Sequence, residues 1–405
     1  MRKINTRNFV RATRSTPREI NRQIALNLVR DHQPISRADL ARHMGMGRGM
    51  VTALVDALLA EGAIYEGAAV EAPRGRKPKM LYVRTHDRHV IAIDVRFSQT
   101  YVMLADFAGS AVALETFETI VDPHDLVHEL SRRIHRMLKA QGGARCEGIG
   151  LVVPGMVDRA TGRVLNSPQL GWKDVDIRDV LARATGLPVH IENAPIACAL
   201  SQLWLGQRGR DVPADFAYVT VGDGVGVGLV VNGEVVRGHG NTAGEFGHVP
   251  LDLAGPTCLC GSRGCLEAYT SNLATLARYL GQDLTRTGLR EMLNSTGLTI
   301  ADLIARARSG DQRARAAFAE TAKYLGAGLA MIVNSLNPSQ IFVGGEITEI
   351  WDQIAPALQK AIAERALTAI AAGTPVIPES ASRFPRLRGA TALVAAPIYA
   401  APQVA

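Results

Sequence analysis

The sequence of 405 residues contains no run of about 20 apolar residues free of charges and of Gly or Pro, so we expect no membrane-spanning helix. The first residues are polar and rich in arginine, without the apolar core that marks a secretory signal. Cysteine is also scarce, with five residues, of which three fall within eight positions. An odd, clustered set argues against a disulfide framework and favours a reducing compartment with metal binding. The sequence therefore predicts a cytoplasmic protein with no membrane partner.

Positive charge is concentrated at one end of the chain. The net charge is +7, yet residues 1–89 contain 17 Lys and Arg against 8 Asp and Glu, while residues 90–405 contain 28 against 30. Such a local excess suits a nucleic-acid backbone, because its attraction for cations is electrostatic and needs no particular sequence. A solvated basic tail would have the same composition, so the choice depends on the pattern of the residues.

Apolar residues at helical spacing predict three helices in this basic segment, over 18–31, about 37–44 and about 47–60. Ser36, followed three residues later by Asp39, has the spacing of a capping box at the start of the second helix. A Gly-Met-Gly segment supplies a tight turn before the third helix. This order is that of a helix-turn-helix. The stripe expected to be buried in the first helix comprises Ile20, Ile24, Leu28 and either Ala25 or Val29.

A two-stranded wing is expected after the third helix, from residues 63–66 and 80–83, with a basic loop between the strands. The start of the third helix would reach base edges in the major groove, while the basic loop suits phosphates or the minor groove. The alternative is a small three-helix dimerisation module with a solvated basic loop. The predicted DNA-binding residues are Arg37, Arg48, Met50, Thr52, Arg74, Arg76 and Lys77.

The rest of the chain has the sequence pattern of an α/β protein. At 405 residues, two or three domains are expected, since one hydrophobic core rarely extends so far. Strand-like apolar runs alternate with helical segments, which predicts sheets covered by helices. An amphipathic helix is expected over about 123–140. The predicted strands cover residues 89–95, 100–106, 111–120, 148–155, 216–221, 226–231 and 341–343.

The strongest local signal is His248 together with Cys258, Cys260 and Cys265. Three thiolates and one imidazole complete a tetrahedral zinc shell and leave no position for a reactive water, so this Zn²⁺ would be structural. Glycines between the cysteines allow the turns that such close spacing needs. The alternative is a loop with free thiols. The other two cysteines stand in apolar surroundings and are expected in the core.

Several segments together resemble the ROK (repressor, open reading frame, kinase) family. The family's central signature is matched by Ala-Gly-Glu-Phe-Gly-His-Val-Pro at 243–250 and by the Cys-x-Cys-Gly-x-x-Gly-Cys-Leu-Glu pattern at 258–267. A fused N-terminal helix-turn-helix is the arrangement of the family's xylose- and N-acetylglucosamine-type repressors. Further matches are 219–228 to a phosphate loop, 334–345 to a nucleotide-side loop, and 165–168 and 192–193 to sugar-binding segments.

The resemblance implies an actin-like (ribonuclease H-like) α/β module with two lobes and a sugar cleft between them. A winged helix-turn-helix would occupy residues 1–85. The first lobe would cover 86–195, and the second lobe, with the zinc loop, 196–405. The C-terminal helix would return to the first lobe.

The family's sugar contacts would fall on Asn166, Asn193, Glu245, His248 and Glu267. Carboxylates and amides can form paired hydrogen bonds with vicinal hydroxyls. The two glutamates flank the zinc ligands, so the metal would brace the loop that carries them. His248 would then place one ring nitrogen on zinc and direct the other toward the sugar. The alternative for either glutamate taken alone is an ordinary surface carboxylate.

Departures from the kinase pattern argue against catalysis. Family kinases carry a general-base Asp where this chain has Ala194, and losing a general base typically costs ~10²–10⁴ in rate. The family's Asp-x-Gly-Gly-Thr phosphate loop is represented here by Asp94 followed by Val-Arg-Phe-Ser, although Arg96 could still attract an anion. Asp223 adds a negative charge where phosphate would lie. We therefore expect no catalytic residue and no kinase activity.

These features predict a sugar-responsive DNA-binding regulator, most simply a repressor of carbohydrate uptake or catabolism genes. Its partners would be double-stranded operator DNA, a sugar or sugar phosphate, and further copies of itself in a homodimer or homotetramer. Two other hypotheses stay open: a bifunctional ATP-dependent sugar kinase, and a regulator relieved by a protein partner. Activation instead of repression would also be compatible with the sequence.

Overall fold

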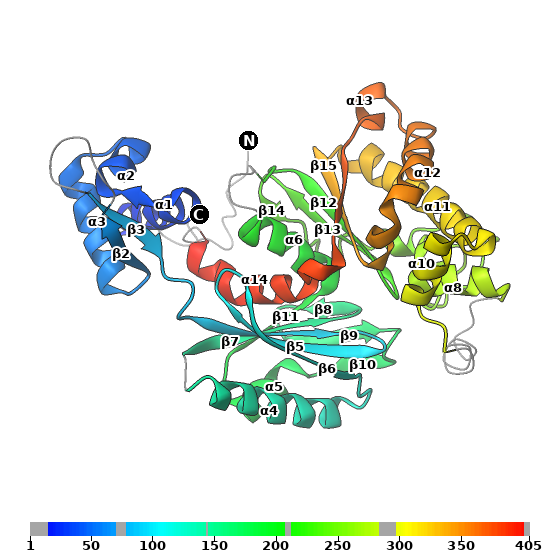
Figure 1. The fold of residues 1–405 in the computed structure, drawn as a ribbon, viewed down its shortest axis with the longest axis horizontal. Helices are drawn as coiled ribbons and strands as arrows, with labels where there is room; N and C mark the ends of the chain where they lie inside the picture. Colours follow the sequence, from blue (N-terminus) through cyan, green and yellow to red (C-terminus); the bar gives the residue numbers. More distant parts are fainter. Residues whose placement is uncertain (1–14, 70–77, 143–144, 207–211, 283–296, 401–405) are drawn as a thin grey trace.

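The computed structural model describes residues 15–69, 78–142, 145–206, 212–282 and 297–400 (Figure 1). An N-terminal module of three helices and a small sheet lies at one end. Two larger α/β lobes follow, each built on a five-stranded sheet. The C-terminal helix α14 (Pro385–Tyr399) lies between the N-terminal module and the first of these sheets.

The N-terminal module confirms the predicted helices and the strand pair that follows them. Ser36 caps the second helix by accepting a hydrogen bond from the Asp39 amide, and Gly45 ends that helix with a left-handed φ of 62°. Strands β1, β3 and β2 form an antiparallel sheet in which Ile64 pairs with Val83. The elements are α1 (Thr16–His32), β1 (Ile35–Ser36), α2 (Arg37–Met44), α3 (Arg48–Ala60), β2 (Ile64–Ala69) and β3 (Lys79–Val83).

The buried face predicted for the first helix was wrong in part. Ile24 is 44% exposed, whereas Ala25, Leu26 and Val29 are buried. The buried stripe is set by the neighbours of α1, which are α2, α3, β3 and the distant helix α14, and the position of α14 cannot be derived from local periodicity. The predicted Ala25 and Val29 belong to this buried face, while Ile24 points to solvent.

The first lobe is built on a mixed sheet with the order β11-β7-β4-β5-β6. Two helices, α4 (Pro123–Ala140) and α5 (Arg178–Thr185), pack on this lobe, and α4 has the predicted bounds because Asp122 caps its first turn. The predicted strand over 148–155 begins earlier, so Cys146 is its first residue and is only partly buried. The strands are β4 (His89–Val95), β5 (Gln99–Asp106), β6 (Ala111–Glu118), β7 (Cys146–Val153) and β11 (Val189–Asn193).

A small antiparallel sheet, which the sequence pattern did not predict, follows β7 and forms one wall of the space between the lobes. Its strands are too short to show a clear alternation of apolar and polar residues. They are β8 (Met156–Asp158), β9 (Arg163–Ser167) and β10 (Trp172–Val175).

The second lobe has the sheet order β14-β13-β12-β15-β16. Among the described residues, α11 (Gln312–Leu336) is the one helix long and apolar enough to span a bilayer, but 61% of its apolar window is buried in the lobe. The strands are β12 (Phe216–Val221), β13 (Val225–Val231), β14 (Glu234–Val235), β15 (Gln340–Gly344) and β16 (Val376–Glu379). The other helical segments are η1 (Phe246–His248), α7 (Glu267–Thr270), α8 (Asn272–Leu280), α10 (Ile300–Ser309), η2 (Glu346–Ile350), α12 (Trp351–Ala363), α13 (Ala369–Ala372) and η3 (Ala381–Arg383).

Two helices, α6 (Ala194–Leu205) and α14, join the lobes, and we call them the connecting helices. Helix α6 packs on β12 and β13 of the second lobe, α14 packs on β4 and β7 of the first, and the two pack on each other. Their approach is close, since a Cβ on Gly389 would come within 2.3 Å of the Ala197 carbonyl oxygen. A Cβ on Gly150 would likewise come within 1.8 Å of the Ala390 carbonyl oxygen.

The connecting helices also reach the N-terminal module. Residues Val394, Ala395 and Tyr399 of α14 belong to the same hydrophobic core as α1 and α3. Gln23 and Asn27 of α1 donate to the last backbone carbonyls of α14, at 2.6 and 2.8 Å. The N-terminal module is therefore packed directly onto the C-terminal helix.

Candidate functional site

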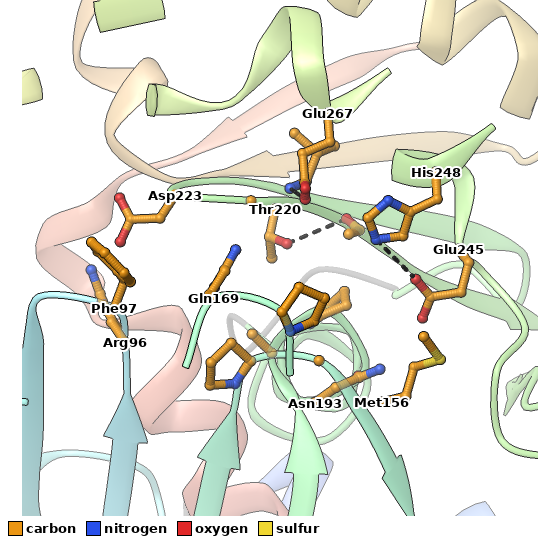
Figure 2. Close-up of a pocket in the computed structure, with 18 of the residues that line it drawn as sticks. Arg96, Phe97, Met156, Gln169, Asn193, Thr220, Asp223, Glu245, His248 and Glu267 are labelled. Carbon is orange, nitrogen blue, oxygen red and sulfur yellow. Dashed lines mark hydrogen bonds and ion pairs between the residues drawn. The ribbon is translucent and has the colours of Figure 1, made fainter. Parts of the chain in front are cut away.

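A cleft opens between the two lobes, lined by residues from both (Figure 2). Its walls come from the ends of β4 and β7, the start of α6, the turn between β12 and β13, and the segment around η1 and α7. The cleft has two ends of different chemistry. We call the end at Glu245, His248 and Glu267 the metal end, and the end at Arg96, Asp223 and Arg386 the charged end.

Three of the predicted sugar-binding residues meet at the metal end. The carboxylate of Glu267 accepts a hydrogen bond from the Val225 amide at 2.9 Å, which fixes its orientation at the start of α7. The imidazole Nε2 of His248 lies 3.9 Å from the Glu245 carboxylate. Burial raises the pKa of both glutamates, and each lies near His248, whose charge would lower it. Two carboxylates and an imidazole facing one cavity can hydrogen-bond a ring with several hydroxyls.

The two predicted asparagines occupy different places. Asn193 lines the cleft at the start of α6, where its side-chain oxygen accepts from the Ile196 amide at 3.1 Å and caps the helix. Asn166 lies in strand β9 and lines a neighbouring pocket, which shares the wall residues Pro168 and Gln169 with the cleft. The structure thus brings four of the five predicted sugar contacts together in the cleft, whereas Asn166 lines the neighbouring pocket.

His248, Cys258, Cys260 and Cys265 form a group next to the metal end, which we call the metal group. Their ligand atoms all lie within 4.8 Å of one another. The sulfurs of Cys260 and Cys265 are 3.8 Å apart, which fits a tetrahedral ion, since Zn–S bonds of about 2.3 Å separate two sulfurs by roughly 3.8 Å. Burial raises the pKa of the Cys265 thiol to about 11 in the metal-free chain, so a thiolate there needs a cation beside it. These residues can hold a metal ion.

His248 connects the metal group to the cleft. Its Nδ1 lies 3.8 Å from the Cys258 sulfur, while its Nε2 faces Glu245. The Glu267 carboxylate also contacts the Cys258 sulfur, at 3.6 Å. Gly264 allows the loop to close, because a Cβ there would come within 1.6 Å of the Asp252 carbonyl oxygen and its φ is 67°. Holding a metal ion would therefore fix both glutamates from behind.

The charged end contains a network that crosses the cleft. The guanidinium of Arg96 donates to Asp94 at 2.7 Å and to Glu346 at 3.1 Å. Arg386, at the start of α14, lies 3.7 Å from the other oxygen of Asp94, which is fully buried. Asp223 lines the same end (Figure 2). Burial and the nearby Glu346 raise the pKa of Asp223 to about 6.

Three positions that depart from the kinase pattern, Arg96, Phe97 and Asp223, lie at this end (Figure 2). Ala194 lines the cleft at the first position of α6 and offers only a methyl group. The side chains of Arg96 and Phe97 occupy the turn after β4, where the family pattern has glycines. The retained pair Gly344 and Gly345 has a packing reason, because a Cβ on Gly345 would come within 1.8 Å of the Val221 carbonyl oxygen.

Four cleft residues were not singled out from the sequence. Gln169 directly follows a segment that resembles a sugar-binding motif, so its position could have suggested it. Thr220 falls within the 219–228 match to a phosphate loop but was not named as a site residue, and Met156, at the start of a short strand, has no local signal of a site. Arg386 enters the cleft only because α14 returns to the first lobe, which no short-range pattern shows.

The residues predicted to contact DNA fall into three groups. Arg48, Met50 and Thr52 lie in the first turns of α3, where Arg48 is exposed and Met50 is 58% exposed. Arg37 instead donates to Asp56 at 2.8 Å and to Glu66 at 3.1 Å, so it fastens α2 to α3 and β2. The loop residues Arg74, Arg76 and Lys77 lie outside the described residues.

Comparison with known proteins identifies the family. The chain matches the ROK family over residues 90–396. It belongs to the ROK family. A xylose repressor of Caldicellulosiruptor bescii is 29% identical over 360 residues, covering 87% of this chain and 89% of that protein. The DNA-binding transcriptional dual regulator NagC of Escherichia coli is 26% identical over 363 residues, covering 89% of this chain and 88% of that regulator.

Solved structures separate the ROK module from the N-terminal module. A ROK family transcriptional regulator, described as a homologue of the E. coli Mlc protein, has a TM-score of 0.77 and 25% identity, and covers 95% of this chain and 97% of its own. A ROK family glucokinase from Streptomyces griseus has a TM-score of 0.65 and covers 75% of this chain and 98% of its own. At 24% identity the glucokinase shows the fold alone, the actin-like module with two α/β lobes.

Proposed function

We propose that this ROK-family chain is a sugar-responsive DNA-binding repressor of carbohydrate uptake or catabolism genes, released when a sugar occupies the cleft. The observation that carries the proposal is the extent of the similarity. Relatives named as regulators align with 87% to 95% of the chain, whereas the glucokinase covers only 75%. Residues 1–85 are the DNA-binding domain, 86–195 the first ROK lobe and 196–405 the second, with α14 returning to the first.

The N-terminal module serves as a winged helix-turn-helix. Helix α3 presents Arg48 and Met50 at its exposed N-terminal end, where recognition helices contact base edges. The antiparallel strands β2 and β3 make the wing, and the basic loop between them carries Arg74, Arg76 and Lys77 toward phosphates. Arg37, whose guanidinium pairs with Asp56 and Glu66, would contact DNA from the start of α2.

The connecting helices provide the physical link between sugar and DNA. Helix α6 begins at Asn193 and Ala194 in the cleft, and its Trp204 lies under the guanidinium of Arg30 in α1, 5.4 Å from the ring centre. Helix α14 begins at Arg386 in the cleft and ends at Tyr399, whose ring centre lies 5.0 Å from the same guanidinium. A sugar that moves one lobe against the other would therefore displace α1.

By linkage, a sugar weakens DNA binding by the same factor by which DNA weakens sugar binding, typically ~5–150-fold. Two copies of the chain, as a homodimer or within a homotetramer, would place two α3 helices on half-sites of a palindromic operator. The protein acts inside the cell, where operator DNA lies.

The metal group holds a structural Zn²⁺ through His248, Cys258, Cys260 and Cys265. The all-protein donor set of three sulfurs and one nitrogen suits zinc and leaves no open position. The metal then keeps Glu245, His248 and Glu267 in place for a sugar, together with Asn193 at the start of α6. The neighbouring Asn166 supports this wall from strand β9.

The proposed function does not include phosphoryl transfer. Ala194 cannot accept a proton from a sugar hydroxyl, and the turn after β4 is filled by side chains. A sugar-dependent release of ADP by the purified protein would contradict this and support the bifunctional kinase.

Retention of an operator fragment from the DNA upstream of the protein's own gene tests the proposal. We expect the full-length protein to retain the fragment, one sugar of a panel to release it, and Glu245→Ala to remove that release while retention persists. Glu349→Ala, an exposed carboxylate outside the cleft, is the matched control. Specific binding that no sugar changes would favour relief by a protein partner. Absence of specific binding at every salt concentration would contradict the proposal itself.

A further inference from the structure

A loop of the second lobe contacts the first lobe just before it reaches the metal end of the cleft. It covers residues 237–244, between β14 and Glu245, and we call it the crossing loop. The Ala243 amide donates to the Arg237 carbonyl at 3.0 Å, so the two ends of the loop are joined. Gly244 packs tightly on β13, since a Cβ there would come within 2.2 Å of the Val227 carbonyl oxygen. Contacts of this loop with the first lobe therefore bear on the position of Glu245.

The first such contact is an ion pair between the lobes. The guanidinium of Arg237 donates to the carboxylate of Glu192, in strand β11 of the first lobe. Glu192 is fully buried, and its other oxygen accepts from the Asn193 amide at 3.1 Å. An unpaired buried carboxylate is strongly unfavourable, and Arg237 supplies the compensating cation from the opposite lobe. Of the segment 192–193, only Asn193 lines the cleft, so the ion pair acts on a ligand through its neighbours.

Asn241 makes the second contact of the crossing loop with the first lobe. Its Nδ2 donates to the Val157 carbonyl in β8 at 2.7 Å, and its Oδ1 accepts from Arg237 at 2.9 Å. Val157 directly follows Met156, which lines the cleft. The φ of Asn241 is 58°, in the left-handed region that asparagine and glycine tolerate best. One side chain thus connects Arg237 to the wall of the cleft formed by the small sheet.

The two contacts connect groups on opposite sides of the cleft. Asn193 and Met156 line it from the first lobe and Glu245 from the second, all on the right-hand side of Figure 2. A sugar that hydrogen-bonds to Asn193 and Glu245 at the same time needs them at one separation. Loosening a site by about 1 Å is enough to impair it. The crossing loop supplies this constraint without touching the ligand.

We propose that Arg237 is a positioning residue of the sugar site. Through its pair with Glu192, it holds Asn193 of the first lobe and Glu245 of the second at the separation that a bound sugar requires. The inference rests on the proposed function, because it concerns the same cleft. Helix α6 begins directly after Asn193, and its Trp204 contacts α1. The ion pair therefore also fixes the start of a helix that would carry the signal of an occupied cleft to the DNA-binding domain.

Calorimetric titration of the full-length, zinc-loaded protein with glucose, N-acetylglucosamine and xylose tests the inference. Arg237→Gln should weaken binding of the sugar that the native protein binds by about tenfold or more, as loss of a hydrogen bond to a charged group does. Arg237→Lys keeps a cation beside Glu192 and should recover part of the affinity. Arg133→Gln breaks an ion pair of similar exposure on α4, outside the cleft, and should leave sugar affinity unchanged. Native sugar affinity in a folded Arg237→Gln variant would overturn the inference.

Two further variants decide the question if loss of the cation unfolds the chain. The double variant Arg237→Gln with Glu192→Gln leaves no unpaired buried charge, so it should fold and still bind sugar about tenfold or more weakly than the native protein. Asn241→Gly suits the left-handed backbone and removes only the side-chain contacts with Val157 and Arg237, so sugar affinity should fall by about two- to tenfold.

Thermal unfolding of the same variants separates positioning from a purely structural role. A structural role alone would lower the melting temperature and leave the sugar affinity of the folded protein unchanged. That result in the double variant would overturn the inference, and in Asn241→Gly it would overturn the part assigned to the second contact. Absence of sugar binding by the native protein would overturn the proposed function, and the inference with it.

Discussion

At the metal end of the cleft, the carboxylates of Glu245 and Glu267 stand beside side chains that can be fixed from behind by an ion. Arg96 lies at the other end of the cleft (Figure 2), and its guanidinium donates to Asp94 and Glu346. The first arrangement leaves oxygen and nitrogen atoms facing a ligand, whereas the second satisfies its charges internally. One cleft can thus keep ligand binding at one end while the other end becomes part of the fold.

Among the changes considered, removal of the metal should have the largest effect on sugar binding at the metal end. Chelation of the ion, or Cys258→Ser, should weaken sugar binding by about 100-fold or more, since the loop that holds Glu245 and Glu267 loses its support. Operator binding without sugar should persist, because the N-terminal module packs on α14 and not on the metal group. Titration calorimetry and fragment retention would measure both. Cys146→Ser, at the start of β7, is the control, and equal effects of the two serine variants would refute the assignment.

Glu245→Ala should have the next largest effect. Loss of a charged hydrogen-bond partner typically costs ~1.5–3 kcal/mol, so sugar affinity should fall by about 10- to 150-fold. Burial raises the pKa of Glu245, which means that its ionised form is unfavourable in the folded protein. Removing this carboxylate should therefore not lower the melting temperature, which thermal unfolding would measure. Unchanged sugar affinity in Glu245→Ala would mean that the ligand does not occupy the metal end.

A third prediction concerns communication from the cleft to the DNA-binding domain. Arg30→Leu removes the guanidinium that lies over both Trp204 and Tyr399, a contact worth about 0.5–2 kcal/mol. We expect sugar and operator each to bind within about threefold of normal, while the weakening of one by the other shrinks severalfold. Sugar titrations with and without operator DNA measure this coupling. Arg84→Leu, on an exposed linker ion pair, is the control, and undiminished coupling in Arg30→Leu would disprove the route.

A smaller effect is expected from Asp223→Asn on stability. Burial and the surrounding Asp94 and Glu346 raise the pKa of Asp223 from 3.8 to about 6, against the opposing effect of Arg96 and Arg386. The folded protein then binds this proton more tightly than the unfolded chain, so the ionised group destabilises the fold above about pH 6 and ceases to do so as the pH falls toward 3.8.

The asparagine variant should therefore be more stable than the native protein at about pH 7.5, by roughly 1–2 kcal/mol, because water in the cleft screens part of the ~3 kcal/mol that such a pKa shift represents. The difference should shrink as the pH falls below about 6 and be nearly lost at about pH 3, where the native side chain is protonated in both states. Urea unfolding at the two pH values would show this. A constant difference across this range would argue against a raised pKa.

What could be predicted from the sequence was set by local chemistry. Ser36 and Asp39 mark the start of α2, and Asp122 before Pro123 marks the start of α4, because capping depends on residues within one turn. The metal group and the metal end were identified from residues within 25 positions of one another. Such features are formed by residues that are close in sequence, so they do not depend on how distant segments pack.

What could not be predicted depends on contacts between distant segments. The buried face of α1 is set by its packing on α2, α3 and β3 and also on α14, more than 350 residues later in the chain, so local periodicity alone placed Ile24 inward. The ion pairs of Arg37 could not be predicted either, because Asp56 and Glu66 reach it only in the folded module. Arg386 belongs to the cleft for the same reason. A charged side chain can be read from sequence as a ligand contact or as an ion pair, and only the fold decides.

The smallest effect should come from Ala194→Asp, which restores the acidic residue of the kinase pattern at the start of α6. If the missing base were the only obstacle, this single change would produce sugar-dependent ADP in a coupled assay. We expect no increase above background, because Arg96 and Phe97 still fill the turn after β4 and Glu346 still occupies the guanidinium of Arg96. The triple variant that combines Ala194→Asp with Arg96→Gly and Phe97→Gly removes that obstruction, and its ADP release is compared with that of the single variant. Activity in the single variant would show that the charged end still admits a nucleotide phosphate, and the two ends of the cleft would then differ less than their contacts indicate.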